Sequence, residues 1–459
     1  MSGKGNAVVV GAGISGLTAA RQLSREGWDV TVVELEKTVG GLARSFHYNG
    51  HTFDIGPHRF HTDDPTVLEF IDETLGDDKI IIDRSSGVWF FNRYHDWPLA
   101  RKSLFRMPFG VMVGAFFDLF LRGRAKDESF EQYILSLYGK TLYRLFFKPY
   151  TEKFLRYPCD QLHSDWASAG INRAVIDKRY QATSLFKVIK STLFPRPVKT
   201  KFIYPASGGV DVFCKRLAGK IENDGGSVHT GARVSGLATA GHKITGLTIS
   251  LEDGGVLNMR PDLVVWTAPP SAVAKLLELP DWGLEFLSLI AFNYEIEGPP
   301  QVPYQWTYYG AEELIFNRAS LPANFAAHTA PPGYSGICIE LACMEGDGLW
   351  NEPEHLRSLV ERDMVRTRLV RRYNEIVDLH VERIRNTYPI YTIEYREKLH
   401  AATTALNRYE NLLMLGRTGT FWYNNMDHSI RQALNLAATV NGDGNLASWR
   451  EQIMNNRDL

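Results

Sequence analysis

The N-terminal part of the chain alternates between short apolar runs and a segment with helical spacing. Residues 6–10 form an apolar, β-rich run, residues 14–26 carry apolar side chains at helical intervals, and residues 28–34 form a second apolar run. Two parallel strands need a crossover of this kind, and such crossovers are right-handed. The pattern therefore predicts a βαβ unit at the start of the chain.

The pattern changes twice after this unit. Residues 64–150 are mainly helical in their spacing, interrupted by a predicted hairpin at 87–97. The further predicted elements are a helix at 210–221, strands between 227 and 260, a buried strand at 263–268, short antiparallel strands at 286–344, a helix at 356–374, a buried strand at 412–415 and a helix at 429–440.

This order of elements predicts an α/β fold built from discontinuous segments. We expect a Rossmann-type dinucleotide-binding domain, of the glutathione-reductase-like kind, from residues 1–63, 200–285 and 405–459. Residues 64–199 are expected to form a mainly helical insertion that contributes to the substrate side. Residues 286–404 are expected to form a second substrate domain, an antiparallel sheet with a helix.

Composition excludes several classes of partner and site. Lys and Arg total 51 against 52 for Asp and Glu, so the chain lacks the basic field that gathers nucleic acid. The spacing of the four cysteines fits neither a zinc site nor a disulfide framework, and we expect reduced thiols and no metal. No leader pattern precedes the first strand, which predicts a cytoplasmic protein.

Residues 107–121 form the longest apolar stretch of the chain. It is shorter than the roughly 20 residues that span a bilayer as a helix, so no transmembrane segment is expected. Two interpretations remain for it. It forms a buried or half-buried helix, or it presents a hydrophobic surface to a membrane or to a lipid-linked substrate.

The turn after the first strand carries the first candidate chemistry. Gly11, Gly13 and Gly16 permit, in order, a tight turn, close approach of backbone to a pyrophosphate, and packing of helix on strand. Glu34 ends the second strand, where a carboxylate accepts the hydroxyl groups of a ribose. Together they predict a dinucleotide site, and FAD and NAD both fit this motif.

A second glycine pair follows at residues 39–44, where Arg44 offers a charged partner to the pyrophosphate. Residues 8–45 resemble the FAD signature shared by amine oxidases, protoporphyrinogen oxidases, phytoene-type desaturases and UDP-galactopyranose mutases, which implies that the cofactor is FAD. The cofactor-binding residues expected from the glycine motifs and this resemblance are Gly11, Gly13, Ile14, Ser15, Gly16, Glu34, Leu35, Gly41, Leu42, Ala43, Arg44, Arg233 and Val234.

Three further stretches, 54–62, 137–153 and 416–426, resemble motifs of UDP-galactopyranose mutases. The resemblance implies that the first stretch lies beside the flavin, that Arg417 and the turn at Met426 lie over its ring, and that Tyr423 reaches a substrate diphosphate. The additional cofactor-binding residues expected on this ground are Gly56, Pro57, His58, Gly416, Arg417, Asn425 and Met426.

The chain departs from the mutase pattern at three places. Asn425 stands where the mutases carry aspartate, and only Arg173 lies at a suitable spacing to stand for their diphosphate-binding arginines. Residues 204–209 instead resemble a glycine turn of the oxidase and desaturase branch. The resemblance is therefore to a mutase-like flavoprotein within the wider superfamily.

His58, His61 and Tyr423 are the candidate catalytic residues, because a histidine that titrates near neutrality can guide a proton at flavin N5 or act as acid and base. Bonding to backbone carbonyls is the alternative for either histidine. Aromatic walls from Trp306, Tyr308, Tyr388 and Tyr391, an anion-binding Arg318, and Arg173 and Tyr423 complete the candidate substrate site, although core packing or solvation also explains several of them.

Two reaction mechanisms are compatible with the same FAD cofactor. In the first, reduced FAD offers N5 to the anomeric carbon of a nucleotide sugar or related glycosyl compound, without net oxidation. In the second, oxidised FAD removes a hydride from a small molecule. A third interpretation, a binding protein without catalysis, also stays open. The expected partner is a small molecule, and a homodimer is compatible with the sequence.

Overall fold

The computed structural model describes residues 4–97, 108–121, 123–167, 200–442, 446 and 449–451. Its centre is a five-stranded, all-parallel sheet in the order β19-β13-β1-β2-β9. The strands are β1 (Asn6–Val10), β2 (Asp29–Val33), β9 (Ser227–His229), β13 (Leu263–Trp266) and β19 (Leu412–Met414). Strands distant in sequence thus form one Rossmann-type sheet, which confirms the predicted α/β fold class.

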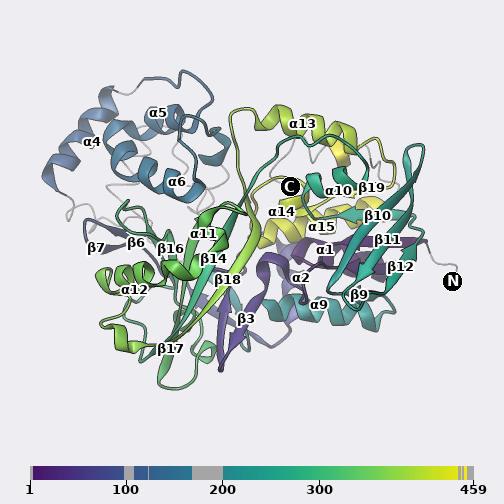
Figure 1. Cartoon of the computed structure of the whole chain (residues 1–459), viewed down its shortest axis with the longest axis horizontal. Coiled ribbons are helices and arrows are strands. Elements are labelled where there is room, and N and C mark those ends of the chain that lie inside the picture. The colour runs from purple at the N-terminus through teal and green to yellow at the C-terminus, as the bar shows by residue number, and fades with distance from the viewer. Residues whose placement is uncertain are drawn as a thin grey trace.

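Both faces of this sheet are buried, because alternate residues of β1 pack into two different cores. Ala7 and Val9 join a cluster with helices α1 (Ile14–Arg25), α9 (Asp211–Asn223) and α15 (Met426–Asn441). Val8 and Val10 join a cluster with the antiparallel strands β10 (Ala232–Ala240), β11 (Lys243–Leu251) and β12 (Val256–Met259) and with α10 (Pro270–Leu276). Helices therefore cover one face and a small sheet the other (Figure 1).

A seven-stranded sheet in the order β18-β14-β17-β16-β15-β6-β7 forms the second body of the fold. Only the β15–β6 pair is parallel. The strands are β6 (Ser86–Phe90), β7 (Arg93–Asp96), β14 (Phe286–Glu297), β15 (Trp306–Tyr309), β16 (Arg318–Ser320), β17 (Tyr334–Cys343) and β18 (Ile376–Pro389). The hairpin predicted at 87–97 is β6 and β7, while β14 and β17 are longer than the short strands expected there.

A helical layer lies against this sheet at the end of the molecule opposite the N-terminus (Figure 1). It contains α4 (Phe109–Leu121), α5 (Phe130–Leu142), a π-helical turn at Tyr143–Phe147 and α6 (Lys148–Leu155). Within the described ranges no helix combines the length and apolar character needed to cross a membrane. The four cysteines are free and buried, as expected.

Two smaller strand pairs connect these parts: β3 (Ser45–Tyr48) with β4 (His51–Asp54), and β5 (Lys79–Asp83) with β8 (Lys201–Pro205). Asp54 accepts hydrogen bonds from Tyr204 Oη at 2.7 Å and from the Val210 backbone at 3.0 Å. This buried carboxylate therefore joins the first βαβ unit to the chain that returns to it.

Several element boundaries differ from the sequence predictions. Helix α2 (Pro65–Leu75) shares the core of α1 and α9, so its packing favours placing it with the nucleotide-binding part rather than with the helical insertion. The helix predicted at 356–374 is α12 (Arg357–Arg366) and ends there, because Arg368 takes a left-handed φ of 63°. The other α-helices of the described residues are α11 (Gly348–Asn351), α13 (Tyr395–Leu406) and α14 (Gly416–Gly419).

Candidate functional site

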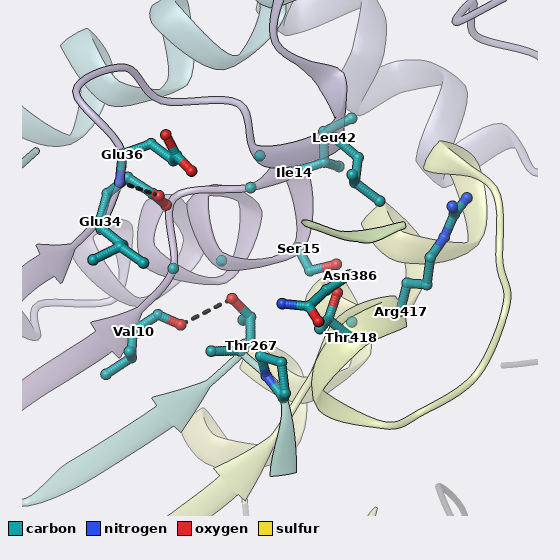
Figure 2. Close-up of a pocket in the computed structure, with 18 of the residues that line it drawn as sticks. Val10, Ile14, Ser15, Glu34, Glu36, Leu42, Thr267, Asn386, Arg417 and Thr418 are labelled. Atoms are coloured by element: carbon teal, nitrogen blue, oxygen red, sulfur yellow. Dashed lines mark hydrogen bonds between the residues drawn. The ribbon is translucent and has the colours of Figure 1, made fainter. Parts of the chain in front are cut away.

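A cavity of about 640 Å³ opens at the carboxyl ends of the central parallel strands, where ligands bind in folds of this kind. Of the predicted cofactor residues, those that line it are Gly11, Gly13, Ile14, Ser15, Gly16, Glu34, Leu35, Gly41, Leu42, Ala43, Arg44, His58, Arg233, Val234, Gly416, Arg417, Asn425 and Met426. Gly56 and Pro57 are not in its lining. Figure 2 shows Glu34 and Arg417 at opposite ends of this cavity, with Ser15 between them.

The three glycines of the first turn are required for different reasons. A Cβ on Gly11 would lie 2.1 Å from Thr267 Oγ1, and one on Gly16 would lie 2.0 Å from the Gly11 carbonyl oxygen. Gly13 has an ordinary extended conformation, and the nearest atom to its Cβ position is the Cα of Gly41 at 3.9 Å. The protein alone therefore leaves room for a side chain at Gly13, and the open backbone there fits close approach by an external group.

The second glycine motif folds directly over the first. The Gly40 backbone donates to the Ala12 carbonyl at 2.8 Å, and Gly40 and Gly41 both have left-handed φ values, 121° and 56°. A short 3₁₀ turn, Gly41–Ala43, follows and carries Arg44 to the cavity wall. The Arg44 guanidinium lies 3.6 Å from the Glu36 carboxylate. These contacts place the Gly40 and Gly41 backbone against Gly13 and bring a guanidinium group to the wall of the same cavity.

Two helix N-termini meet this cavity. Helix α1 begins at Ile14 and α15 begins at Met426, and neither has a side-chain hydrogen bond at its N-cap. Uncapped N–H groups and the helix dipole create a partial positive charge at each end. The cavity is thus suited to a ligand with anionic or electron-rich groups at two separate places.

Glu34 is held rigidly at one end of the cavity. Its Oε2 accepts from the Ala12 backbone at 2.6 Å. Its Oε1 accepts from the Glu36 backbone at 2.9 Å, the bond drawn in Figure 2. Burial raises the pKa of Glu34, and the two backbone bonds counteract that rise. Each carboxylate oxygen retains a further lone pair, so the group can still accept hydroxyl donors from a ribose.

Arg417 lies at the other end, between the first cavity and a second one. Its guanidinium donates to the Thr387 carbonyl at 3.0 Å and to the Asn424 carbonyl at 3.1 Å. It also lies 4.6 Å from the ring centroid of Tyr423 and 5.4 Å from that of Tyr388. Backbone carbonyls therefore fix a cation at the boundary between the two cavities.

The structure corrects the expected titration of His58. Burial, together with the guanidinium groups of Arg417, Arg318 and Arg59, lowers the pKa of His58 to about 3. The imidazole is therefore neutral at physiological pH. The expectation that His58 titrates near neutrality was wrong. A neutral ring can still donate or accept one hydrogen bond at the cavity wall.

The second cavity is lined mainly by aromatic side chains and adjoins Arg417. Its lining consists of Trp97, Phe146, Phe147, Tyr150, Thr151, Phe154, Trp166, Tyr308, Arg318, Tyr388 and Tyr423. Among these described residues no carboxylate, histidine or lysine is present. Arg318 is the one charged group of the lining, so this lining suits a neutral or anionic guest better than a cation.

Arg318 is held by a bidentate ion pair with Glu340, with N···O distances of 2.5 Å at both contacts. The Arg318 guanidinium also donates to Tyr388 Oη at 3.2 Å. Burial opposes its charge, but Glu340 raises the pKa of Arg318 well above its usual value. A Cβ on Gly56 would lie 2.8 Å from both members of the pair. Gly56 thus makes room for the pair rather than lining a cavity.

The other predicted substrate and catalytic residues lie in different places. His61 lines neither cavity and its Nδ1 is 3.3 Å from the Lys201 carbonyl. Trp306 is buried in a cluster with Phe202 and Phe325, and Tyr391 is buried where its Oη accepts from the Tyr423 backbone at 2.7 Å. Arg173 lies outside the described residues. Of these candidates only Arg318 and Tyr423, with Tyr308 and Tyr388, reach the second cavity.

Sequence reasoning missed several residues that line the cavities. The first cavity is also lined by residues 266–269, at the end of the buried strand β13 and just after it, and by Asn386 of β18. Phe146 and Tyr150 line the second. The rule that ligands bind at the carboxyl ends of parallel strands would have found the β13 residues. Phe146 and Tyr150 both lie in the stretch 137–153 that resembles a mutase motif, and that resemblance could have pointed to them.

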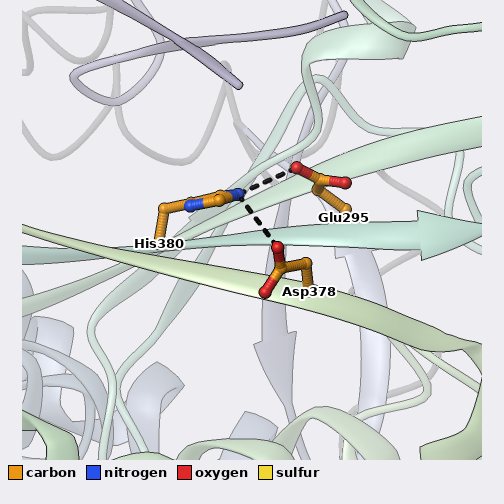
Figure 3. A group of neighbouring side chains, drawn as sticks. All are labelled: Glu295, Asp378 and His380. Carbon is orange, nitrogen blue, oxygen red and sulfur yellow. Dashed lines mark hydrogen bonds and ion pairs between the residues drawn. The ribbon is translucent and has the colours of Figure 1, made fainter. Parts of the chain in front are cut away.

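A third polar group lies outside both linings. Glu295, Asp378 and His380 come from the neighbouring strands β14 and β18, and their ligand-type atoms lie within 4.8 Å of one another (Figure 3). His380 Nε2 is 2.8 Å from Glu295 and 3.7 Å from Asp378, and its ring stacks on Tyr48. Ion pairing and stacking across the sheet account for these contacts. The expectation that the protein binds no metal stays a prediction.

Comparison with curated proteins gives partial matches to several flavoenzymes. A probable UDP-galactopyranose mutase from Klebsiella pneumoniae is 27% identical over 170 residues, which are 32% of this chain and 40% of that protein. Protoporphyrinogen oxidase 2 from Arabidopsis thaliana is 42% identical over 73 residues, 16% of this chain and 14% of that protein. The chain thus matches less than half the length of these relatives.

Solved structures match over nearly the whole chain. Reduced UDP-galactopyranose mutase superposes with a TM-score of 0.82 at 20% identity, covering 99% of this chain and 98% of that one. A putative protoporphyrinogen oxidase from Exiguobacterium sp. 255-15 gives a TM-score of 0.73 at 16% identity, covering 95% and 99%. At these identities the likeness establishes a shared fold.

The family comparison covers more than half of the chain. The family described as flavin-containing amine oxidoreductase matches residues 14–300, a range that begins at the first residue of α1 and ends just after β14. Together with the two glycine motifs at the sheet edge, this match shows that the chain belongs to the flavin-containing amine oxidoreductase family and that its cofactor is FAD.

Proposed function

We propose that FAD occupies the first cavity with its adenosine at Glu34 and its flavin ring near Arg417. The observation that supports this orientation is the open backbone at Gly13, which lies at the N-terminus of α1 in a cavity that Arg44 also lines. A pyrophosphate there would meet a helix N-terminus and a guanidinium together. When bound, FAD supplies a nucleophilic N5 in its reduced form or a hydride acceptor in its oxidised form.

For the substrate we propose a nucleotide sugar or a related glycosyl compound, bound in the second cavity. The observation that supports this proposal is that the lining is mainly aromatic and that Arg318 is its only charged group among the described residues. Aromatic faces pack against sugar rings and nucleobases, and a fixed guanidinium pairs with a phosphate. A cationic amine would meet Arg318 and Arg417 without a carboxylate in the lining, which disfavours it.

The residues have distinct roles in this proposal. Tyr423 projects into the second cavity from the segment after Arg417 and would donate its hydroxyl hydrogen to a diphosphate oxygen. Arg318, fixed by Glu340, would orient the same anion. The neutral imidazole of His58 would bond to the cofactor or substrate without adding charge. The aromatic walls would exclude water from the reacting carbon.

Anaerobic incubation of the purified yellow protein with a panel of nucleotide sugars tests the proposal. Oxidised and dithionite-reduced enzyme are compared while flavin absorbance and product mass are followed. Product isomers formed only by reduced enzyme, without net flavin turnover, are the expected result. The assignment would be overturned if neither oxidised nor reduced enzyme converted any nucleotide sugar and the enzyme turned over an amine.

A dehydrogenase acting on a small molecule is the second candidate. The observation that favours it is the glycine turn at residues 204–209, of the type seen in oxidases, where Tyr204 and the Val210 backbone bind Asp54. A Cβ on Gly209 would lie 2.5 Å from Asp54 Oδ1, so this turn is built into the packing of the cofactor domain. Bleaching of the oxidised flavin by substrate in the same anaerobic assay would identify this reaction.

A further inference from the structure

Helix α4 exposes an unusually apolar surface. Phe109 is 77% exposed, Phe116 and Phe117 are 55% and 58% exposed, and Phe120 and Leu121 are 64% and 80% exposed. Four exposed phenylalanines on one short helix present an apolar area on the order of several hundred Å². Patches of this size on the surface of a protein are commonly sites of contact with a partner or a membrane.

These side chains lie on one face of the helix. Phe109, Phe116 and Phe120 recur at intervals of seven and four residues, and Phe117 and Leu121 continue the same face by one position. The opposite side packs on α5, where Asp118 accepts a hydrogen bond from the Thr141 backbone. The single carboxylate of this helix is thereby turned toward the protein and away from the apolar face.

Basic residues accompany the apolar face. Arg124 and Lys126 are exposed directly after α4, and Lys140 is exposed beside the Thr141 contact. The neighbouring acids Asp127 and Glu128 are also exposed, but both are engaged by the protein: Asp127 accepts from the Ser129 backbone at 2.9 Å, and Glu128 lies 3.7 Å from the Arg396 guanidinium and 3.3 Å from His163 Nε2. In the sequence, Arg101, Lys102, Arg106 and Arg122 also flank the stretch, although the whole chain has a net charge of −1. Positive charge is therefore concentrated around an apolar surface.

We propose that this face of α4 docks peripherally on an anionic phospholipid bilayer, with the phenylalanines among the acyl chains and the basic residues at the headgroups. Amphipathic helices with aromatic residues on one side and Lys or Arg beside them bind membranes in this way. A symmetric contact between two copies through the same face would bring the like-charged groups together. The charge pattern thus favours an anionic lipid surface over a second copy of the chain.

Flotation of the flavin-loaded protein with vesicles tests the proposal. One set contains phosphatidylglycerol mixed with phosphatidylcholine, and the other contains phosphatidylcholine alone. The wild-type protein should float with the anionic set, and added salt should weaken the binding. The double variant Phe116→Ser/Phe120→Ser should bind at least about tenfold more weakly, because two apolar side chains are lost from the bilayer.

Matched variants separate this effect from misfolding. Val256→Ser changes a residue that is 56% exposed on β12 and should bind like the wild type. Arg124→Glu/Lys126→Glu should lose binding to the anionic vesicles, and flavin absorbance and thermal melting should be unchanged in every variant. Failure of the wild type to float, or equal flotation of the phenylalanine variant, would overturn the proposal. Dimerisation in solution that the phenylalanine variant abolishes would do so too.

Discussion

Paired substitutions at Gly13 and Gly16 test whether the first glycine motif serves a ligand or only the fold. Gly13→Ala places a methyl group where the nearest protein atom is 3.9 Å away, in a backbone conformation that alanine adopts freely. The apoprotein should therefore keep its stability or gain about 0.4–1 kcal/mol from reduced entropy of the unfolded chain. The same methyl would project into the space assigned to the pyrophosphate.

Gly13→Ala should weaken the binding of FAD without destabilising the apoprotein. Overpacking by one methyl group commonly costs about 1–3 kcal/mol, which corresponds to a loss of affinity of roughly tenfold to a hundredfold. Gly16→Ala meets the Gly11 carbonyl at 2.0 Å and the Val9 side chain at 3.3 Å. It should destabilise the apoprotein by at least about 1–3 kcal/mol, because backbone and core would both have to move.

The assay compares urea unfolding of deflavinated wild type and variants with FAD titrations followed by flavin fluorescence. Added FAD should stabilise the wild type by mass action and stabilise Gly13→Ala much less. The reasoning fails if Gly13→Ala binds FAD as tightly as the wild type. It also fails if the Gly13→Ala apoprotein is destabilised as strongly as Gly16→Ala.

Three further changes test the second cavity and the electrostatics of the site. Tyr423→Phe should weaken binding of a nucleotide sugar about tenfold, as measured by perturbation of the flavin spectrum, with flavin content unchanged. Glu340→Gln should loosen Arg318 and raise the Kd for the same ligand, whereas unchanged affinity would argue against a role for the pair. In the wild type, unfolding free energy should fall as pH decreases from about 6.5 to 3, because the unfolded chain protonates His58 before the folded one does. His58→Gln should reduce this loss by on the order of 5 kcal/mol in chemical denaturation.

The central sheet could be predicted from the sequence because its strands are buried on both faces. Residues 6–10 and 263–266 are continuous apolar runs, and both are strands in the structure. The sequence analysis did not identify β18, although its first half alternates polar residues, Asp378, His380 and Glu382, with apolar ones as a half-exposed strand does. That strand is specified by its pairing with the buried β14, which a local pattern does not contain.

Much of the lining of the first cavity could be predicted from the sequence, because its glycine motifs are recognisable locally, whereas Gly56 and Pro57 were expected there and do not line it. Gly16 is constrained by the Gly11 carbonyl and Gly41 by the Gly13 backbone, which are local contacts, whereas Gly11 is constrained by Thr267 from a segment far away in the sequence. The lining of the second cavity could not be predicted in this way. Phe146, Tyr308 and Tyr388 come from the helical layer and from two separate strands, and only the tertiary packing brings them together.

Charged side chains where the two cavities meet influence one another, although they come from different sequence motifs. His58, Arg318 and Arg417 occupy different segments of the chain, yet the two guanidinium groups help to keep the imidazole neutral. Glu340 compensates Arg318 alone, while Arg417 is held by backbone carbonyls that carry no formal charge. A net positive charge therefore remains where the cavities meet. Such a charge is costly to bury without an anion, so the boundary between the cavities is itself an argument for an anionic substrate or cofactor group at that point.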